Sequence, residues 1–140
     1  MRSTLICAAA LLVAISSFGL TEEKRQTKCP VMGGDVDPAT SIRMDYQGQR
    51  IYFCCAGCPS KFKADPEKYF AKLAAEGIAL ENIQAACPVT GDALKKRDAF
   101  TDYKGRRVYF CCKDCVSAFE KNPPKYLQQL NPISDKSKAS

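Results

Sequence analysis

The sequence predicts an α+β fold made of two small modules in tandem. The first observation is a repeated cysteine cluster: residues 52–58 read Tyr-Phe-Cys-Cys-Ala-Gly-Cys, and residues 109–115 read Tyr-Phe-Cys-Cys-Lys-Asp-Cys. The second is a Cys-Pro-Val turn that precedes each cluster, at Cys29 and at Cys87. The third is that matching phenylalanine, proline, tyrosine and leucine residues follow the cluster at the same spacing in both copies. Duplication explains this likeness better than chance does.

Each module is expected to contain a cysteine turn, a β-hairpin and C-terminal helices. In the first module, residues 29–34 include a proline and two glycines, which favour a tight turn. Residues 42–46 alternate in polarity and residues 50–54 are rich in β-branched and aromatic side chains, so a hairpin should form around the Gln-Gly pair between them. Apolar spacing predicts one helix over residues 58–65 and a second over residues 66–73, which opens with a proline.

The second module repeats this plan with one residue fewer. Cys87 follows Cys29 by 58 positions, whereas Cys111 follows Cys54 by 57, so one residue has been lost between turn and hairpin. The helical positions also match, with Cys115, Phe119, Pro123, Tyr126 and Leu130 standing for Cys58, Phe62, Pro66, Tyr69 and Leu73.

Composition divides the chain into six segments. A module of this size is near the lower limit for folding on apolar burial alone, so a metal or a disulfide is expected to stabilise each one. The residues between the modules include three large aliphatic side chains, which predicts a linker that packs on the modules. The expected segments are a signal peptide over residues 1–19, a flexible leader over 20–28, the first module over 29–76, a packed linker over 77–86, the second module over 87–130 and a disordered tail over 131–140.

The N-terminus has the composition of a cleavable export signal. Arg2 precedes an apolar run over residues 5–15, and Ser17 and Gly19 are small residues placed for cleavage after Gly19. The run is shorter than the roughly 20 residues that span a bilayer, so a membrane anchor is the weaker interpretation. Cleavage removes Cys7 and leaves eight cysteines, four in each module. The mature protein is therefore expected in a periplasm or outside the cell, free of the membrane.

Charge and composition argue against nucleic-acid binding and against an enzyme. The formal net charge is +6, but the lysines are scattered and no arginine-aromatic stripe accompanies them, so a solvated surface is expected. The chain has no histidine, which excludes histidine-ligated catalytic zinc and Cys-His or Ser-His nucleophilic pairs. No paired carboxylates or phosphate-binding loop replace them.

The cysteine clusters are candidate sites for a soft metal ion, because thiolates are polarisable ligands. A turn cysteine, a hairpin and cysteines at a helix start resemble a treble-clef zinc-finger plan. A helix start should lower the pKa of Cys58 and Cys115. One ion per module is expected, with zinc or Cu(I) favoured over Cd(II) or Hg(II). The proposed ligands are Cys29, Cys54 and Cys58 in the first module and Cys87, Cys111 and Cys115 in the second, with Cys55 and Cys112 as candidate fourth ligands, or as partners of Cys58 and Cys115 in an alternative set.

The cluster at residues 52–58, followed by Phe62 and by Asp-Pro-Glu-Lys-Tyr at residues 65–69, resembles the YHS domain and the related TRASH-like metal-binding modules. The resemblance covers both modules and implies heavy-metal binding in trafficking, resistance or sensing, with another metal-handling protein as a partner. One departure concerns the turn. YHS domains usually begin Asp-Pro-Val-Cys-Gly, whereas here a cysteine stands at the aspartate position and Met32 or Thr90 stands at the cysteine position. Because a thioether can bind Cu(I) and a threonine cannot, the two sites are expected to differ in affinity.

Three other functions fit parts of the sequence. A disulfide-stapled scaffold suits an exported protein with an even number of cysteines. A structural-zinc interaction module would use the same thiols without exchanging the metal. A thiol oxidoreductase would use the redox spacing of Cys55 and Cys58, but the surrounding βαβ pattern of such enzymes is missing.

Overall fold

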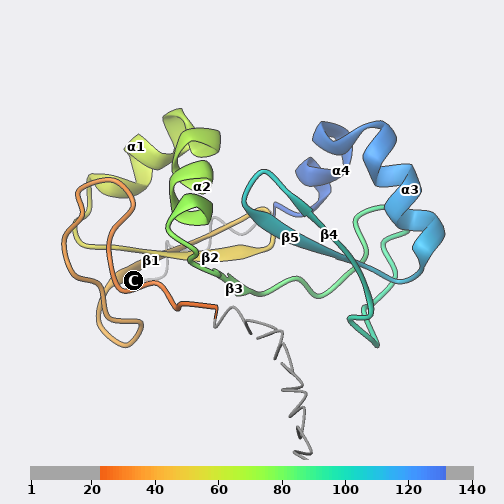
Figure 1. The fold of residues 1–140 in the computed structure, drawn as a ribbon, viewed down its shortest axis with the longest axis horizontal. Helices are drawn as coiled ribbons and strands as arrows, with labels where there is room; N and C mark the ends of the chain where they lie inside the picture. The colour runs from red at the N-terminus through yellow and green to blue at the C-terminus, as the bar shows by residue number, and fades with distance from the viewer. Residues whose placement is uncertain (1–22, 132–140) are drawn as a thin grey trace, which may run out of the picture.

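The computed structural model describes residues 23–131, and the expected signal peptide and most of the expected tail lie outside this range. Two modules lie side by side, and each one places a β-hairpin beneath a pair of helices (Figure 1). The fold is therefore α+β with a repeated module, as the sequence predicts. Among the described residues, none of the helices has the length and apolar character needed to cross a bilayer.

The first module is built on an antiparallel hairpin. Strand β1 (Ile42–Tyr46) pairs with β2 (Gln49–Phe53), with Ile42 opposite Phe53. Strand β2 ends one residue earlier than the sequence pattern predicted, so the cysteines that follow Phe53 lie on a bend instead of a pleated strand. Helices α1 (Cys58–Ala64) and α2 (Pro66–Ala75) then return over the hairpin.

The second module has the same element order. Strand β4 (Ala99–Tyr103) pairs with β5 (Arg106–Phe110), and helices α3 (Lys113–Lys121) and α4 (Pro123–Gln129) follow. Helix α3 begins two residues before its buried cysteine, whereas α1 begins at its own. Pro59 immediately follows Cys58 in α1, and a proline is favoured at the start of a helix because it has no N–H to leave unpaired.

Residues 77–86 connect the modules and contribute a short strand. Strand β3 (Glu81–Asn82) pairs antiparallel with β2, which gives the first sheet the order β1-β2-β3. The side chain of Asn82 donates a hydrogen bond of 2.7 Å to the main-chain oxygen of Arg107 in β5. The linker thus touches both hairpins.

Residues 23–28, the described part of the expected flexible leader, pack against the first module. Lys24 forms a parallel bridge with Ile78, and the amide of Ala79 donates to the carbonyl oxygen of Lys24 at 2.9 Å. Gln26 is buried, with an exposed fraction of 6%. The polar composition of this segment gives no sign of these contacts, because they are made by the main chain and by one amide side chain.

Each module has its own small aromatic core. Phe62 lies at the centre of the first core and contacts Phe53 and Phe70 edge-to-face at centroid distances of 5.7 and 5.3 Å. Phe119 occupies the same place in the second core, 5.3 Å from Phe110. Both central rings are fully buried. Pairs in this geometry add about 0.5–1.5 kcal/mol beyond the burial of their surface, which matters in modules this small.

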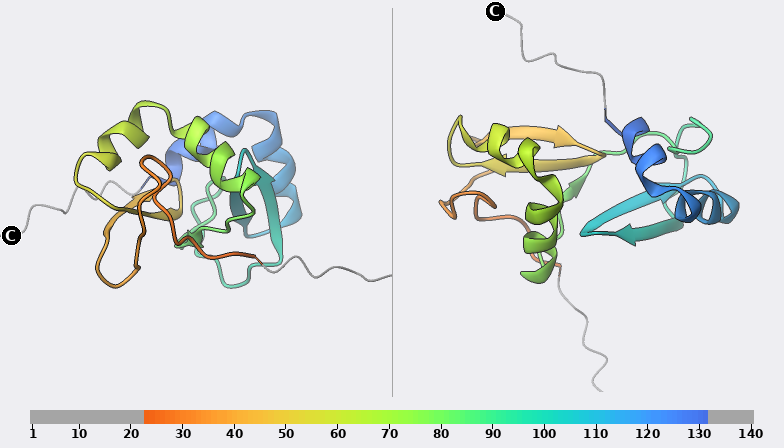
Figure 2. Two further views of the ribbon diagram at one scale, coloured as in Figure 1. Left: turned by 60° about the vertical axis from the view of Figure 1, so that its left-hand side comes forward. Right: turned by 90° about the horizontal axis from the view of Figure 1, so that it is seen from above.

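The modules are joined by a buried arginine. The turn end of the β4–β5 hairpin approaches α2 (Figures 1 and 2). There the fully buried side chain of Arg106 stacks over the ring of Phe70 at 4.3 Å and pairs with Glu67 of α2. Gly105 lies against the main chain of α2, where a Cβ atom would collide with the carbonyl oxygen of Phe70. This contact fixes the second hairpin on the first module.

Candidate metal centres

A tight turn carries the first cysteine of each module. The amide of Cys29 donates to the carbonyl oxygen of Gly34 at 2.8 Å, and the amide of Gly33 donates back to Cys29 at 2.8 Å. Cys87 makes the same pair of bonds with Asp92 and Gly91, also at 2.8 Å. Both cysteines are buried. The turn therefore presents a buried thiol toward the hairpin in both modules.

A buried glutamine attaches this turn to the hairpin. The side-chain amide of Gln26 donates to the carbonyl oxygen of Tyr52 at 2.7 Å, and its oxygen accepts from the amide of Tyr52 at 3.0 Å. The same amide group also donates to the carbonyl oxygen of Lys28 at 3.0 Å. Gln26 thus pairs with β2 as a neighbouring strand would. Because Tyr52 stands two residues before Cys54 and Gln26 stands three before Cys29, the contact sets the spacing of the two cysteines.

The second module contains the same glutamine contact. Gln84 donates to the carbonyl oxygen of Tyr109 at 2.6 Å, accepts from its amide at 2.9 Å and donates to the carbonyl oxygen of Ala86 at 2.9 Å. Neither glutamine was predicted from the sequence to contact the site. A signal was present, since a glutamine occurs three residues before each turn cysteine.

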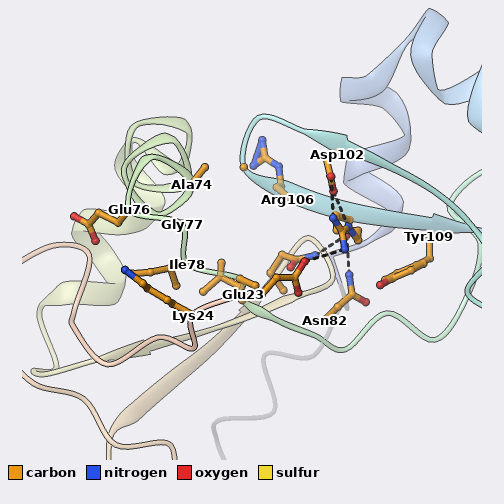
Figure 3. Close-up of a pocket in the computed structure, with 15 residues that line it drawn as sticks. Glu23, Lys24, Ala74, Glu76, Gly77, Ile78, Asn82, Asp102, Arg106 and Tyr109 are labelled. Carbon is orange, nitrogen blue, oxygen red and sulfur yellow. Dashed lines mark hydrogen bonds and ion pairs between the residues drawn. The ribbon is translucent and has the colours of Figure 1, made fainter. Parts of the chain in front are cut away.

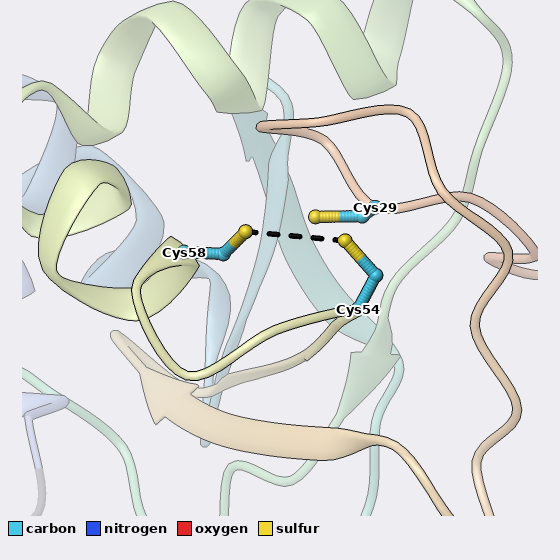
Figure 4. Close-up of side chains that lie close together, drawn as sticks. All are labelled: Cys29, Cys54 and Cys58. Atoms are coloured by element: carbon cyan, nitrogen blue, oxygen red, sulfur yellow. Dashed lines mark hydrogen bonds between the residues drawn. The ribbon is translucent and has the colours of Figure 1, made fainter.

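Three thiols converge in each module. The sulfur atoms of Cys29, Cys54 and Cys58 all lie within 4.8 Å of one another, and the Cys54 and Cys58 sulfurs are 4.0 Å apart. Figure 4 shows the three side chains pointing toward one another from the turn, the bend after β2 and the start of α1. Sulfurs that share one ion at bond lengths of about 2.3 Å are at most about 4.6 Å apart, so the arrangement suits a metal after small side-chain adjustments.

The second module brings together the equivalent residues. The sulfurs of Cys87, Cys111 and Cys115 also lie within 4.8 Å of one another, and those of Cys111 and Cys115 are 3.6 Å apart. In both groups the turn cysteine and the helix cysteine are buried, while the cysteine at the end of the hairpin is exposed. Each site therefore has two buried ligands and one that solvent can reach. These clusters could hold one metal ion per module.

Cys55 and Cys112 lie beside these groups without belonging to them. The Cys55 sulfur is 2.8 Å from that of Cys58, and the Cys112 sulfur is 3.3 Å from that of Cys115. Both side chains are exposed, and all eight described cysteines are free thiols. The bend after β2 explains the contact, because adjacent residues on a continued strand would point to opposite faces.

The turn cysteines are the most acidic thiols of their sites. Burial raises the pKa of Cys29, but hydrogen bonds from the amides of Cys54, Met32 and Val31 outweigh it and lower the pKa to about 7. The pKa of Cys87 is likewise about 7, for the same balance of burial against amide hydrogen bonds. Amides that point at the sulfur stabilise the charged form. A thiolate ligand is thus available at neutral pH in each module.

The helix cysteines behave differently from the sequence prediction. Burial is the largest cause that raises the pKa of Cys58, and its hydrogen bonds with the neighbouring thiols raise the pKa further. The same causes raise the pKa of Cys115. The prediction that a helix start would lower both pKa values was therefore wrong. Removal of the thiol from water and the proximity of other sulfurs outweigh the partial charge of the helix terminus.

The two sites differ at the residue after the Cys-Pro-Val turn. Met32 is 62% exposed and leaves the first site without a hydroxyl neighbour. Thr90 occupies the equivalent position, and its hydroxyl lies 3.5 Å from the Cys111 sulfur. The second site thus has a polar group that can hydrogen-bond a ligand thiolate, whereas the first has an exposed thioether at the equivalent position.

A cavity near the module boundary is not one of these sites. Its volume is about 620 Å³, and no described cysteine lines it. Figure 3 shows that its wall is occupied by linked polar groups. Arg107 contacts Asp102 at 2.8 Å and Glu23 at 3.2 Å. These bonds tie the leader to the second hairpin, so the cavity has a structural explanation.

Comparison with known proteins agrees with the repeat. The sequence pattern of the YHS domain matches residues 27–72 and again residues 85–130. The chain belongs to the YHS domain family. It is also 54% identical over 37 residues to a silver exporting P-type ATPase of Salmonella typhimurium. That match covers 26% of the chain and 4% of the ATPase, so it concerns a small part of a much longer protein. No solved structure matches the chain.

Proposed function

We propose that this YHS protein is an exported, non-enzymatic carrier that binds a soft metal ion in each module through cysteine thiolates. The observation that carries the proposal is the convergence of three thiols from separate elements, repeated in both modules. Thiolates select Cu(I), Zn(II) and other soft ions over hard cations. The silver exporting ATPase that shares sequence with the chain supports a monovalent soft ion, Cu(I) or Ag(I), as the cargo.

An exchanging site fits better than a closed structural one. Cys54 and Cys111 are exposed, as are Cys55 and Cys112 beside them. A structural zinc site is normally closed by four protein ligands, whereas a site with an accessible ligand can pass its ion to a partner. Another metal-handling protein is therefore the proposed partner, and its own thiols would replace the exposed cysteine first.

Native mass spectrometry of the mature protein tests the proposal. The protein is purified with reductant, loaded with Zn(II) or Ag(I) and compared with a chelator-treated sample. We expect bound ions in both modules and a matching fall in thiols that react with alkylating reagent. Eight unreactive thiols without bound metal would contradict the proposal. Sequencing the N-terminus of the exported protein tests cleavage after Gly19.

The alternative of a disulfide-stapled scaffold is favoured by one observation. The Cys55 and Cys58 sulfurs are in contact at 2.8 Å, and the spacing of two residues between them is common in redox disulfides. If air-oxidised protein contains Cys55–Cys58 and Cys112–Cys115 disulfides and reduction restores no metal binding, the scaffold function replaces the carrier.

A further inference from the structure

The exposed fourth cysteine forms a second triangle of sulfurs in the second module. In the second module, the Cys112 sulfur is 4.0 Å from that of Cys111 and 3.3 Å from that of Cys115. The Cys111 and Cys115 sulfurs are themselves 3.6 Å apart. The inner triangle of Cys87, Cys111 and Cys115 therefore shares one edge with an outer triangle of Cys111, Cys112 and Cys115.

Both triangles in the second module are close to the size that one trigonal ion requires. Three sulfurs around an ion at about 2.3 Å are separated by about 4.0 Å when the ion lies in their plane. The edges of the outer triangle are 4.0, 3.6 and 3.3 Å, so its shortest edge must lengthen by about 0.7 Å, and Cys112 is exposed and free to move outward. The shared edge allows the thiolates of Cys111 and Cys115 to bridge two ions.

We propose that each module holds two monovalent soft ions, one in the inner and one in the outer triangle, bridged by the two shared thiolates. This inference rests on the proposed soft-metal function. In the first module the equivalent outer triangle would be formed by Cys54, Cys55 and Cys58, with Cys54 and Cys58, 4.0 Å apart, as the shared edge. Cys55, 2.8 Å from Cys58, rotates outward to reach a bonding position.

Charge and coordination select monovalent ions for this arrangement. Four thiolates with one monovalent ion carry a charge of −3, and a second ion reduces it to −2, the charge of four thiolates around one divalent ion. A divalent zinc ion is almost always held by four ligands, and four sulfurs cannot give two zinc ions four ligands each. Cu(I) and Ag(I) are satisfied by two or three thiolates. The number of bound ions should therefore depend on the valence of the metal.

Silver titration followed by native mass spectrometry tests this inference, because Ag(I) binds thiolates without a change of oxidation state. The reduced mature protein, in chloride-free buffer, should take up four Ag(I) ions. Cys112→Ser should take up three, and the double variant with Cys55→Ser should take up two. The matched control Lys113→Ser, an exposed neighbour without sulfur, should keep four.

X-ray absorption at the silver edge gives an independent measurement. A metal–metal scattering path is expected in the wild type and not in the double variant Cys55→Ser/Cys112→Ser. Two ions in the wild type and two in the double variant would overturn the bridged pair and leave the proposed function intact. Four ions in the double variant would also overturn it, because the added ions would then bind elsewhere. No bound silver in any protein would refute the proposed function itself.

Discussion

Gln26→Ala should loosen the turn of the first module and leave the second unchanged. The substitution removes the partners of the Tyr52 amide and carbonyl groups, which Gln26 contacts at 3.0 and 2.7 Å. Tyr52 is buried, and an unsatisfied buried polar group costs about 1–3 kcal/mol. Two such groups, with some relief from water entering the space, give a loss of about 2–4 kcal/mol in local stability.

Hydrogen exchange of the Tyr52 amide, followed by NMR in the metal-free reduced protein, measures this loss directly. A change of about 2–4 kcal/mol corresponds to exchange that is roughly 30- to 700-fold faster. The two modules serve as controls for each other. The Tyr109 amide donates to the side chain of Gln84 at 2.9 Å, so Gln84→Ala should speed the exchange of that amide and leave the exchange of Tyr52 unchanged. Gln129→Ala, at an exposed helical position, should change neither.

Equal protection of Tyr52 in the wild type and in Gln26→Ala would refute this reasoning. The glutamine also positions the turn cysteine. With one Cd(II) ion loaded in each module, Gln26→Ala should therefore weaken the thiolate-to-metal absorption of the ion in the first module only. Loss of stability with unchanged absorption would mean that Gln26 supports the fold without setting the position of Cys29.

Three further predictions address the ligands and the module contact. Cys29→Ser should remove one bound Cd(II) ion of two in native mass spectrometry, and retention of both would show that the turn thiol is not needed. Met32→Thr should bring the Ag(I) affinities of the two sites closer together, as measured by competition with a thiolate chelator; identical affinities already in the wild type would contradict the expected difference. Gly105→Ala should lower the thermal unfolding midpoint more than Gly91→Ala does. Both glycines have φ of +79°, but of the two only Gly105 lies against the main chain of Phe70. Equal shifts in the midpoint would rule out that contact.

The repeat, the hairpins and the approach of the cysteines could be predicted from the sequence because each leaves a local pattern. Alternation with a Gln-Gly or Lys-Gly turn indicates a hairpin regardless of its surroundings. Adjacent residues on a strand point to opposite faces, so Cys54 and Cys55 can approach the same helix cysteine only where the chain turns. Strand β2 ends at Phe53 and the chain bends there.

The remaining features depend on contacts between distant residues, which no local pattern contains. Gln26 lies in a polar segment that reads as a loop, and only the three-dimensional position of Tyr52 gives its amide two partners. Arg106 reads as a surface residue of a hairpin, yet it is buried over Phe70 of the other module. The pKa of Cys58 depends on burial and on neighbouring thiols more than on its place at a helix start.

Cadmium-113 NMR tests the central claim most directly, because scalar coupling between the ion and cysteine β-protons identifies each ligand. With two equivalents of Cd(II), the account predicts two resonances in the all-sulfur range. One should couple to Cys29, Cys54 and Cys58, and the other to Cys87, Cys111 and Cys115. Resonances that couple only to cysteines of the clusters, without Cys29 or Cys87, would contradict the claim that turn and cluster thiols hold the same ion.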